Sequence, residues 1–249
     1  MRALSTKLKP ASGFSHFLHL GLTMLLPALV FVLIRMNFVV PALAVVLMSK
    51  WRMLAVRPRY WPANVRANAV DMMVGLAVVV FMSHTDAASW HLAWAFLYGV
   101  WLIFIKPGSS LLLVSVQAFI GQSMALMALF LEWKTIPLVG LVFSLWAICY
   151  LTARHFFTSF DESHTSLYSH AWGYFAAALG WILGHWLLFY GSVAQPTLLL
   201  SVVGLVSGAL YYLEETDRLS VVWRRQFVFL LVAILVVILV FSSWGDKTI

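Results

Sequence analysis

The sequence predicts an all-α protein, a polytopic bundle of about nine membrane-spanning helices that forms one domain over residues 1–249. The first observation is composition: 63% of the residues are hydrophobic and 10% are charged, whereas a soluble domain is about half apolar and about a quarter charged. The second is that apolar residues form runs near the ~20 residues that a helix needs to cross a bilayer. The third is that basic residues concentrate in alternate loops, as in oriented membrane proteins.

The expected spans follow one another with short connections. The first resembles a signal sequence, but its apolar region is too long and no clear small-x-small cleavage site follows, so we expect it to be retained. The second is the least regular, because it meets Lys50 and Arg52, whose stems can extend along the helix toward the headgroups. A single re-entrant unit in place of spans one and two is the alternative. The spans are expected at residues 16–34, 38–55, 67–83, 89–105, 110–131, 136–153, 166–190, 195–213 and 224–243.

Polar residues inside the middle spans are few. Asp71 falls in the third span, about one turn from its expected start, where a carboxylate complements the helix dipole. Gln117 and Gln122 lie deep in the fifth span, where interhelical hydrogen bonds or a polar path for a solute would explain them. If the protein carries a solute, Asp71, Gln117 and Gln122 are the expected lining residues. The sixth span holds the single cysteine, Cys149, so no intramolecular disulfide can form.

The last three spans contain packing motifs instead of charges. Small residues four positions apart let helices approach closely, and they occur as Gly180-x-x-x-Gly184 in the seventh span and Gly204-x-x-x-Gly208 in the eighth. We expect these neighbouring spans to pack on each other, with oligomerisation through one of the glycine faces as the alternative. The ninth span, FVFLLVAILVVILVF, is apolar all round, so we expect most of it to face lipid or a partner subunit.

The sixteen Lys and Arg residues orient the spans, with the N-terminus inside and the C-terminus outside. Nine spans place only Arg35, Lys134 and Lys247 on the far side, whereas eight spans would divide the loop charges ten to five and leave Arg35 in the membrane. Because the basic residues lie in short loops, they favour anionic lipid headgroups over nucleic acid as partners. The expected headgroup-binding residues are Arg57, Arg59 and Arg66.

Histidines around the turn after the sixth span offer a second kind of site. Together with carboxylates they could ligate zinc or a similar ion, but their spacing matches no standard motif, and a solvated turn is the alternative. His170 and His185, near opposite ends of the seventh span, could instead hold haems. We expect no cofactor, and Ser207 in GLVSG lacks the Gly-x-Ser-x-Gly nucleophile elbow. The candidate metal ligands are His155, Asp161, His164 and His170.

Segments over most of the chain resemble an uncharacterised family of multi-pass membrane proteins from reduced-genome, candidate-phylum bacteria. The resemblance implies a bacterial cytoplasmic membrane and assigns no activity to any residue. The segments that carry it are Lys50-Trp51-Arg52-Met53, Arg57-Pro58, Arg66-Ala67-Asn68, Asp71, Ile105-Lys106-Pro107-Gly108-Ser109, Ala153-Arg154-His155-Phe156-Phe157, Phe160-Asp161-Glu162, His185-Trp186-Leu187-Leu188, Ala194-Gln195-Pro196 and Trp244-Gly245-Asp246-Lys247.

Short loops, no charge expected at mid-bilayer and an apolar last span favour a non-enzymatic membrane component or complex subunit. Such a protein would bind membrane lipids or partner proteins. One alternative is a transporter or channel for a small solute or amphiphile. The other is an intramembrane enzyme that depends on a metal or haem.

Overall fold

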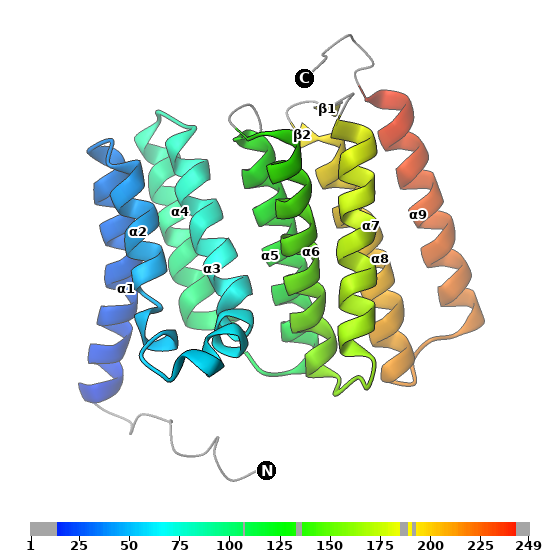
Figure 1. Cartoon of the computed structure of the whole chain (residues 1–249), viewed down its shortest axis with the longest axis horizontal. Coiled ribbons are helices and arrows are strands. Elements are labelled where there is room, and N and C mark those ends of the chain that lie inside the picture. Colours follow the sequence, from blue (N-terminus) through cyan, green and yellow to red (C-terminus); the bar gives the residue numbers. More distant parts are fainter. Residues whose placement is uncertain (1–13, 107, 133–135, 185–188, 191–192, 243–249) are drawn as a thin grey trace.

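The computed structural model describes residues 14–106, 108–132, 136–184, 189–190 and 193–242. Within them the chain is almost wholly helical, so the all-α prediction is confirmed, and successive long helices run in opposite directions (Figure 1). We call the end at which α3, α5, α7 and α9 begin the lower end, as drawn in Figure 1. The elements are α1 (Phe14–Arg35), α2 (Val39–Met48), the 3-10 helices Trp51–Met53 and Pro58–Tyr60, α3 (Trp61–Ser83), α4 (Ala88–Val100), the π-helix Trp101–Ile105, α5 (Leu111–Leu131), α6 (Leu138–Ser159), α7 (Thr165–Leu183), an antiparallel pair of β1 (Phe189–Tyr190) and β2 (Val193–Ala194), α8 (Gln195–Glu215) and α9 (Val221–Phe241).

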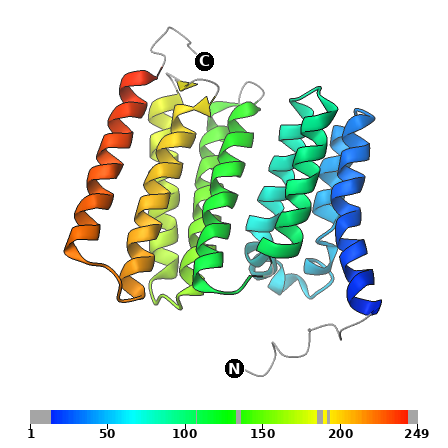
Figure 2. The same ribbon diagram turned by 180° about the vertical axis from the view of Figure 1, so that it is seen from behind.

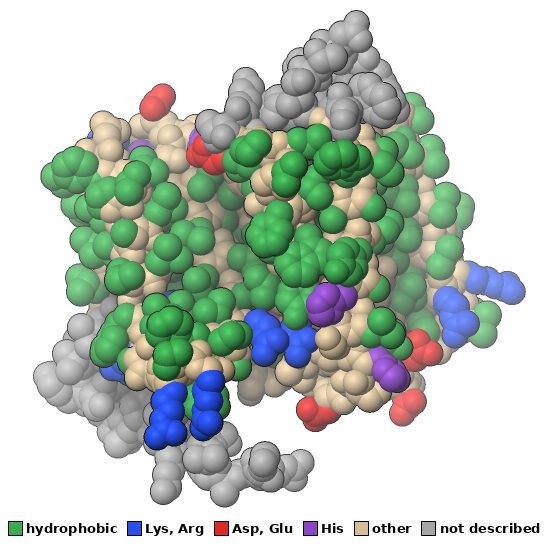
Figure 3. Space-filling model, viewed as in Figure 1, with side chains coloured by type: hydrophobic (Ala, Val, Ile, Leu, Met, Phe, Trp, Pro, Cys, Tyr) green, Lys and Arg blue, Asp and Glu red, His purple; other side chains and the backbone are tan. Residues whose placement is uncertain are grey.

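Six helices in the described part of the chain are long and apolar enough to cross a membrane, which indicates a multi-pass membrane protein. Hydrophobic side chains cover the middle of the face in Figure 3, and charged side chains lie toward its two ends. Two further apolar helices, Thr23–Arg35 and Val39–Met48, are shorter. The six are Pro58–Ser83, Ala88–Ile105, Leu111–Leu131, Leu138–Ser159, Gln195–Glu215 and Val221–Phe241.

The largest departures from the predicted spans concern α2, α3 and α7. The seventh span was expected to reach residue 190, but α7 ends at Leu183, and Phe189–Tyr190 form β1. The second span was expected to continue to residue 55, but α2 ends at Met48. Lys50, just beyond it, turns its ammonium group toward Asp71 instead of extending toward the headgroups. α3 begins at Trp61, before the expected start. Asp71 therefore lies about three turns inside α3, too deep for the first-turn dipole interaction that the sequence predicted.

The core has two main parts, one among α1 to α4 and one among α5, α6, α7 and α8. Contacts between α3 and α5 join the two parts. Gly121 of α5 permits this approach, because a Cβ atom at that position would lie 2.7 Å from Cγ1 of Val70 on α3. A side chain at Gly121 would push the two halves apart.

The glycines of α7 face α6, whereas Gly204 of α8 faces both α5 and α7. A Cβ atom at Gly180 would lie 2.1 Å from Cδ1 of Leu145, and Gly184 also faces α6. α7 therefore packs along α6, whereas α8 packs mainly on α5 and α9, as the view from behind also shows (Figure 2). At Gly204 the nearest atom to an added Cβ is Nε2 of Gln122 on α5, at 2.9 Å. The same Cβ atom would lie 3.3 Å from Cζ2 of Trp172 on α7, so the expected α7–α8 contact is present but small beside the α6–α7 and α5–α8 contacts.

The last helix lies at one edge of the bundle and packs on α8 (Figure 1). Ile238 is its one buried residue. Phe229, for comparison, is 77% exposed. The structure thus leaves most of α9 available to lipid or to another chain, in agreement with its uniformly apolar sequence.

Candidate functional site

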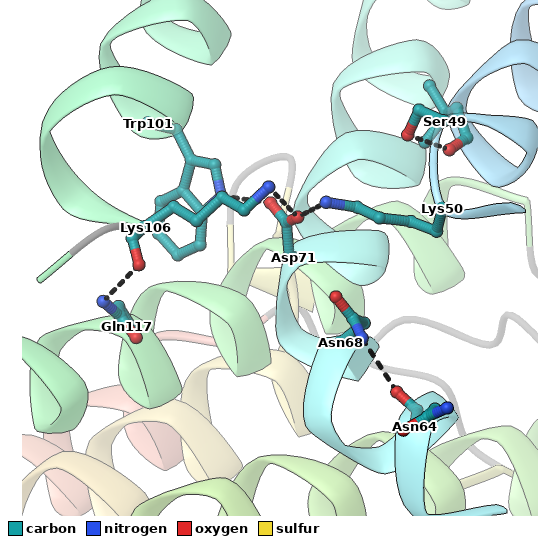
Figure 4. A network of polar contacts seen from close by, with 9 residues as sticks. Ser49, Lys50, Asn64, Asn68, Asp71, Trp101, Lys106 and Gln117 are labelled. Atoms are coloured by element: carbon teal, nitrogen blue, oxygen red, sulfur yellow. Dashed lines mark hydrogen bonds and ion pairs between the residues drawn. The ribbon is translucent and has the colours of Figure 1, made fainter. Parts of the chain in front are cut away.

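Asp71, near the middle of α3, is the centre of a polar network (Figure 4). Its Oδ2 atom forms ion pairs with the ammonium groups of Lys50 and Lys106, the second at 2.9 Å. Its Oδ1 atom accepts a hydrogen bond from Nε1 of Trp101 at 2.9 Å. The carboxylate is therefore fully engaged and ties together the segment after α2, α3 and the end of α4. Asp71 is only 8% exposed. The network therefore holds these segments together in the interior.

The π-helix Trp101–Ile105 explains how two residues of one segment reach the same carboxylate. The backbone N–H of Lys106 donates to the carbonyl of Trp101, five residues earlier, at 2.8 Å. In a π turn residues five apart lie on the same side of the helix, whereas a regular α-helix would separate them. Trp101 and Lys106 can thus both face Asp71. Nothing in the local sequence predicted this irregular turn.

Gln117 closes the polar network toward α5. Its Nε2 atom donates to the carbonyls of Ile105 at 2.6 Å and Gly108 at 3.0 Å, which lie at and beyond the end of the π-helix. Its Oε1 atom lies 3.1 Å from Nε2 of His155 on α6. Gln117 therefore adds a side-chain donor to carbonyls at and just beyond the end of the π-helix, of which that of Ile105 also accepts from the backbone N–H of Gly108. Both polar ends of the side chain are used in this way.

Gln122 joins four helices through a single side-chain amide. Nε2 donates to the carbonyl of Leu200 on α8 at 3.1 Å. Oε1 accepts from Nε1 of Trp172 on α7 at 2.9 Å and from Oγ1 of Thr152 on α6 at 3.2 Å. In an apolar interior such bonds fix how the helices are rotated, because an unpaired donor or acceptor there is costly.

A cavity of about 900 Å³ lies between α5, α6, α7 and α8, with Phe227 of α9 at its wall. It extends from the lower end, where α8 ends and α9 begins, to Gln122 and Thr152 near the middle of the bundle. The wall is mostly apolar and aromatic. Of the residues singled out in the sequence, Gln122, Gly204 and Gly208 line it, whereas Asp71, Gln117, Gly180 and Gly184 do not.

The lower end of this cavity is aromatic and acidic. Tyr168, Tyr211 and Glu214 line it, and the Tyr211 hydroxyl donates to Oε2 of Glu162 at 2.5 Å. Glu162 lies in the turn between α6 and α7. The hydrogen bond from Tyr211, helped by one from the backbone N–H of His164, holds the pKa of the Glu162 carboxyl below its usual range. Glu162 is therefore an anion beside the cavity at neutral pH.

The four candidate metal ligands do not come together. His155 contacts Gln117, whereas Nδ1 of His170 lies 2.7 Å from the carbonyl of Ser166 in its own helix. His164 and Asp161 lie exposed in the α6–α7 turn. Within the described residues, no group of three or more His, Cys, Asp or Glu side chains could hold a metal ion. His185, part of the haem alternative, lies outside the described residues.

The predicted headgroup-binding residues lie at the lower end of α3 and just before it. Arg57 and Arg59 are exposed, and the Arg59 guanidinium lies 4.5 Å from the centre of the Tyr60 ring. Arg66 is half-buried in the second turn of α3. Nε1 of Trp61 donates to two carbonyls of the preceding segment. This arrangement of exposed arginines with aromatic rings is typical of a membrane–water boundary.

Comparison of the chain with known protein families, curated proteins and solved structures finds no match. The site is therefore interpreted from its own residues. The sequence singled out Gln122 but missed Trp172, Thr152 and Tyr211. Their partners are far along the chain: Gln122 and Trp172 are 50 residues apart. The sequence did contain a signal for these residues, because an indole N–H or a hydroxyl within an apolar span needs a hydrogen-bond acceptor.

Proposed function

We propose that this protein is a non-enzymatic component of a cell membrane that binds an amphiphile, a molecule with an apolar tail and a polar head, between α5, α6, α7 and α8. The cavity of about 900 Å³ is the observation that carries the proposal. Its volume is in the range of small-molecule sites, roughly 300–1,000 Å³. An amphiphile-binding protein is one form of the lipid-binding membrane component that the sequence favours.

The distribution of polar groups along the cavity supports an amphiphile over a water-soluble solute. From the middle of the bundle downward, side chains such as Val116, Phe119 and Leu205 offer an apolar wall. The upper polar groups, Gln122 and Thr152, already bond each other and neighbouring helices. Because the stretch of α8 from Gly204 to Glu214 is about 15 Å long, a ligand tail of similar length would fill the cavity.

The charge distribution supports an orientation with the lower end in the cytoplasm. Among the described Lys and Arg residues only Arg35 lies at the upper end, whereas the described loops at the lower end are rich in Lys and Arg. The positive-inside rule places such loops in the cytoplasm. We propose that α1, α2 and α7 complete nine spans, with the cavity facing the cytoplasmic leaflet and its anionic headgroups.

A carrier for the same amphiphile is a second candidate. Gln122 favours it, because this side chain lies at the inner end of the cavity near the middle of α5. A binding component would hold the amphiphile in one leaflet, whereas a carrier would move it across. Flux of a labelled amphiphile through reconstituted vesicles distinguishes the two.

Binding is tested by filling the cavity with a larger side chain and measuring how much amphiphile associates with the protein. The full chain is reconstituted in vesicles with a spin-labelled single-chain amphiphile, and electron paramagnetic resonance gives its motionally restricted fraction. Ser207→Trp places a large ring in the cavity, and we expect this fraction to fall. Val232→Trp, at a 53% exposed position of α9 outside the cavity lining, is the matched control and should leave it unchanged.

Equal restricted fractions for the wild type and both variants would overturn the proposal. Size-exclusion profiles and melting temperatures in detergent establish that each variant is folded before the comparison. If Ser207→Trp and Val232→Trp lower the restricted fraction equally, the amphiphile associates with the general protein surface. This outcome also contradicts a cavity site.

A further inference from the structure

We infer that the head of this amphiphile is cationic, an amine or quaternary ammonium group. This inference rests on the proposed amphiphile binding and adds the chemical class of the ligand. It is drawn from the lower end of the cavity, where the polar head of a bound amphiphile would lie, and from the kinds of side chain that the structure gathers there.

Carboxylates supply the negative charge. Glu214 lines the cavity at the end of α8. Glu162 lies beside the cavity, because it accepts a hydrogen bond from Tyr211, which lines the cavity. None of the described residues that line the cavity is Lys or Arg. An anionic head would meet like charge here without a basic partner in the lining, whereas a cation would be attracted.

Aromatic rings line the same end of the cavity. Phe157 of α6 lies between Tyr168 of α7 and Tyr211 of α8, with ring centroids 5.4 Å and 5.1 Å away. All three rings line the cavity. The Phe157 and Tyr211 planes are nearly perpendicular, at 88°, so their faces point in different directions. Several aromatic faces around one space are the arrangement that binds quaternary ammonium groups through cation–π interactions.

The basic residues nearest along the chain do not cancel this preference. Arg218 lies in the α8–α9 connection, and Arg224 and Arg225 lie in the first turn of α9. None of them lines the cavity, and Arg224 and Arg225 are exposed. On an outer helix with a lipid-facing surface, they are placed to reach anionic headgroups of the bilayer. The cavity thus differs in charge from the surface beside it.

Three spin-labelled probes with the same stearyl chain and different heads test the inference: a trimethylammonium, an alcohol and a sulfate. Vesicles of digalactosyl diacylglycerol are neutral and contain no choline to compete. For each probe, the cavity-bound part is the part of the motionally restricted fraction that Ser207→Trp removes. In the wild-type full chain, we expect this part to be roughly tenfold larger for the ammonium probe than for the alcohol probe. The sulfate should associate least.

Two carboxylate variants give a matched comparison. Glu214→Gln should lower the ammonium preference roughly threefold without changing association of the alcohol. Asp86→Asn removes a carboxylate charge in the exposed turn at the upper end, outside the cavity lining, and should leave the preference unchanged. Tyr168→Leu should lower the preference as well, because it removes a ring face but no charge.

The outcomes separate the two proposals. If Ser207→Trp lowers association of all three probes equally, amphiphile binding stands and the cationic head is wrong. A preference for the sulfate, or equal effects of Glu214→Gln and Asp86→Asn, also overturns the cationic head. If Ser207→Trp changes association of no probe, the proposed function itself fails.

Discussion

Nε1 of Trp101 lies 2.9 Å from Oδ1 of Asp71, thirty residues earlier in the chain. The two residues belong to different helices, and the bond depends on the π turn at the end of α4. With Lys50 and Lys106 on the other carboxylate oxygen, the interaction makes Asp71 a structural centre of the N-terminal half.

The first prediction concerns the charge of Asp71. Asp71→Asn leaves the ammonium group of Lys50, whose side chain is 12% exposed, without its counter-charge. Breaking a buried pair in this way costs about 3 kcal/mol. We expect that loss in the free energy of unfolding, measured in mixed micelles, with topology unchanged. Asp86→Asn, at an exposed turn residue, is the control and should have little effect. A stable Asp71→Asn protein that no longer binds an amphiphile would instead make Asp71 part of a ligand site.

The second prediction concerns the amide of Gln122. Gln122→Leu leaves the Trp172 indole N–H without its acceptor and removes the donor to the Leu200 carbonyl, whereas the Thr152 hydroxyl can still donate to Ile148. Leaving such groups unpaired costs about 2 kcal/mol. The same measurement in mixed micelles should show this loss, whereas Gln226→Leu on the exposed side of α9 should be nearly neutral. An unchanged stability of Gln122→Leu would mean that the four-helix junction is not formed.

The third prediction concerns the close contact of α7 with α6. An added Cβ at Gly180 would lie 2.1 Å from a Leu145 methyl carbon. Gly180→Ala should therefore lower stability by about 1–3 kcal/mol through overpacking. At Gly208 the nearest atom, from Phe156, would be 3.8 Å away. Gly208→Ala should thus be neutral or slightly stabilising, since alanine favours the helix. Melting temperatures of the two variants in detergent measure the difference. A Gly208→Ala protein less stable than Gly180→Ala would mean that α7 packs closely through another face.

The fourth prediction concerns pH. Hydrogen bonds from Tyr211 and the His164 backbone lower the pKa of Glu162 in the folded state. A lowered pKa stabilises the fold above the unfolded value, near 4.3, and this contribution is lost as pH falls through the folded pKa. Tyr211→Phe should therefore destabilise the protein at pH 7, and its difference from the wild type should shrink below about pH 4. Thermal unfolding between pH 7 and 3 measures it. Tyr212→Phe is the control, and a difference that grows on acidification would contradict this role of Glu162.

The positions of α5 and α8 could be predicted well from the sequence. The expected span 110–131 is α5, Leu111–Leu131, and the expected span 195–213 is α8, Gln195–Glu215. Long apolar runs between turn residues carry this information locally. The segment from Lys50 to Trp61 was predicted less well, because an ion pair with Asp71 competes there with continuation of the helix.

The candidate site was predictable only in part. Gln122 could be singled out because an amide deep in an apolar span is unusual, but the cavity beside it could not. The cavity exists because α8 packs on α5 while α7 packs on α6. Which pairs form depends on small contacts such as that of Gly180 with Leu145.

The sequence by itself determined that this chain is a bundle of apolar helices with basic loops at one end, because helix length, apolarity and charge are properties of consecutive residues. Only the tertiary structure decided the partners of Asp71 and Gln122, the faces used by the glycines and the position of the cavity. These depend on how each helix is rotated against others. The bond from Gln122 to Leu200 spans 78 residues, and no local pattern specifies such a contact.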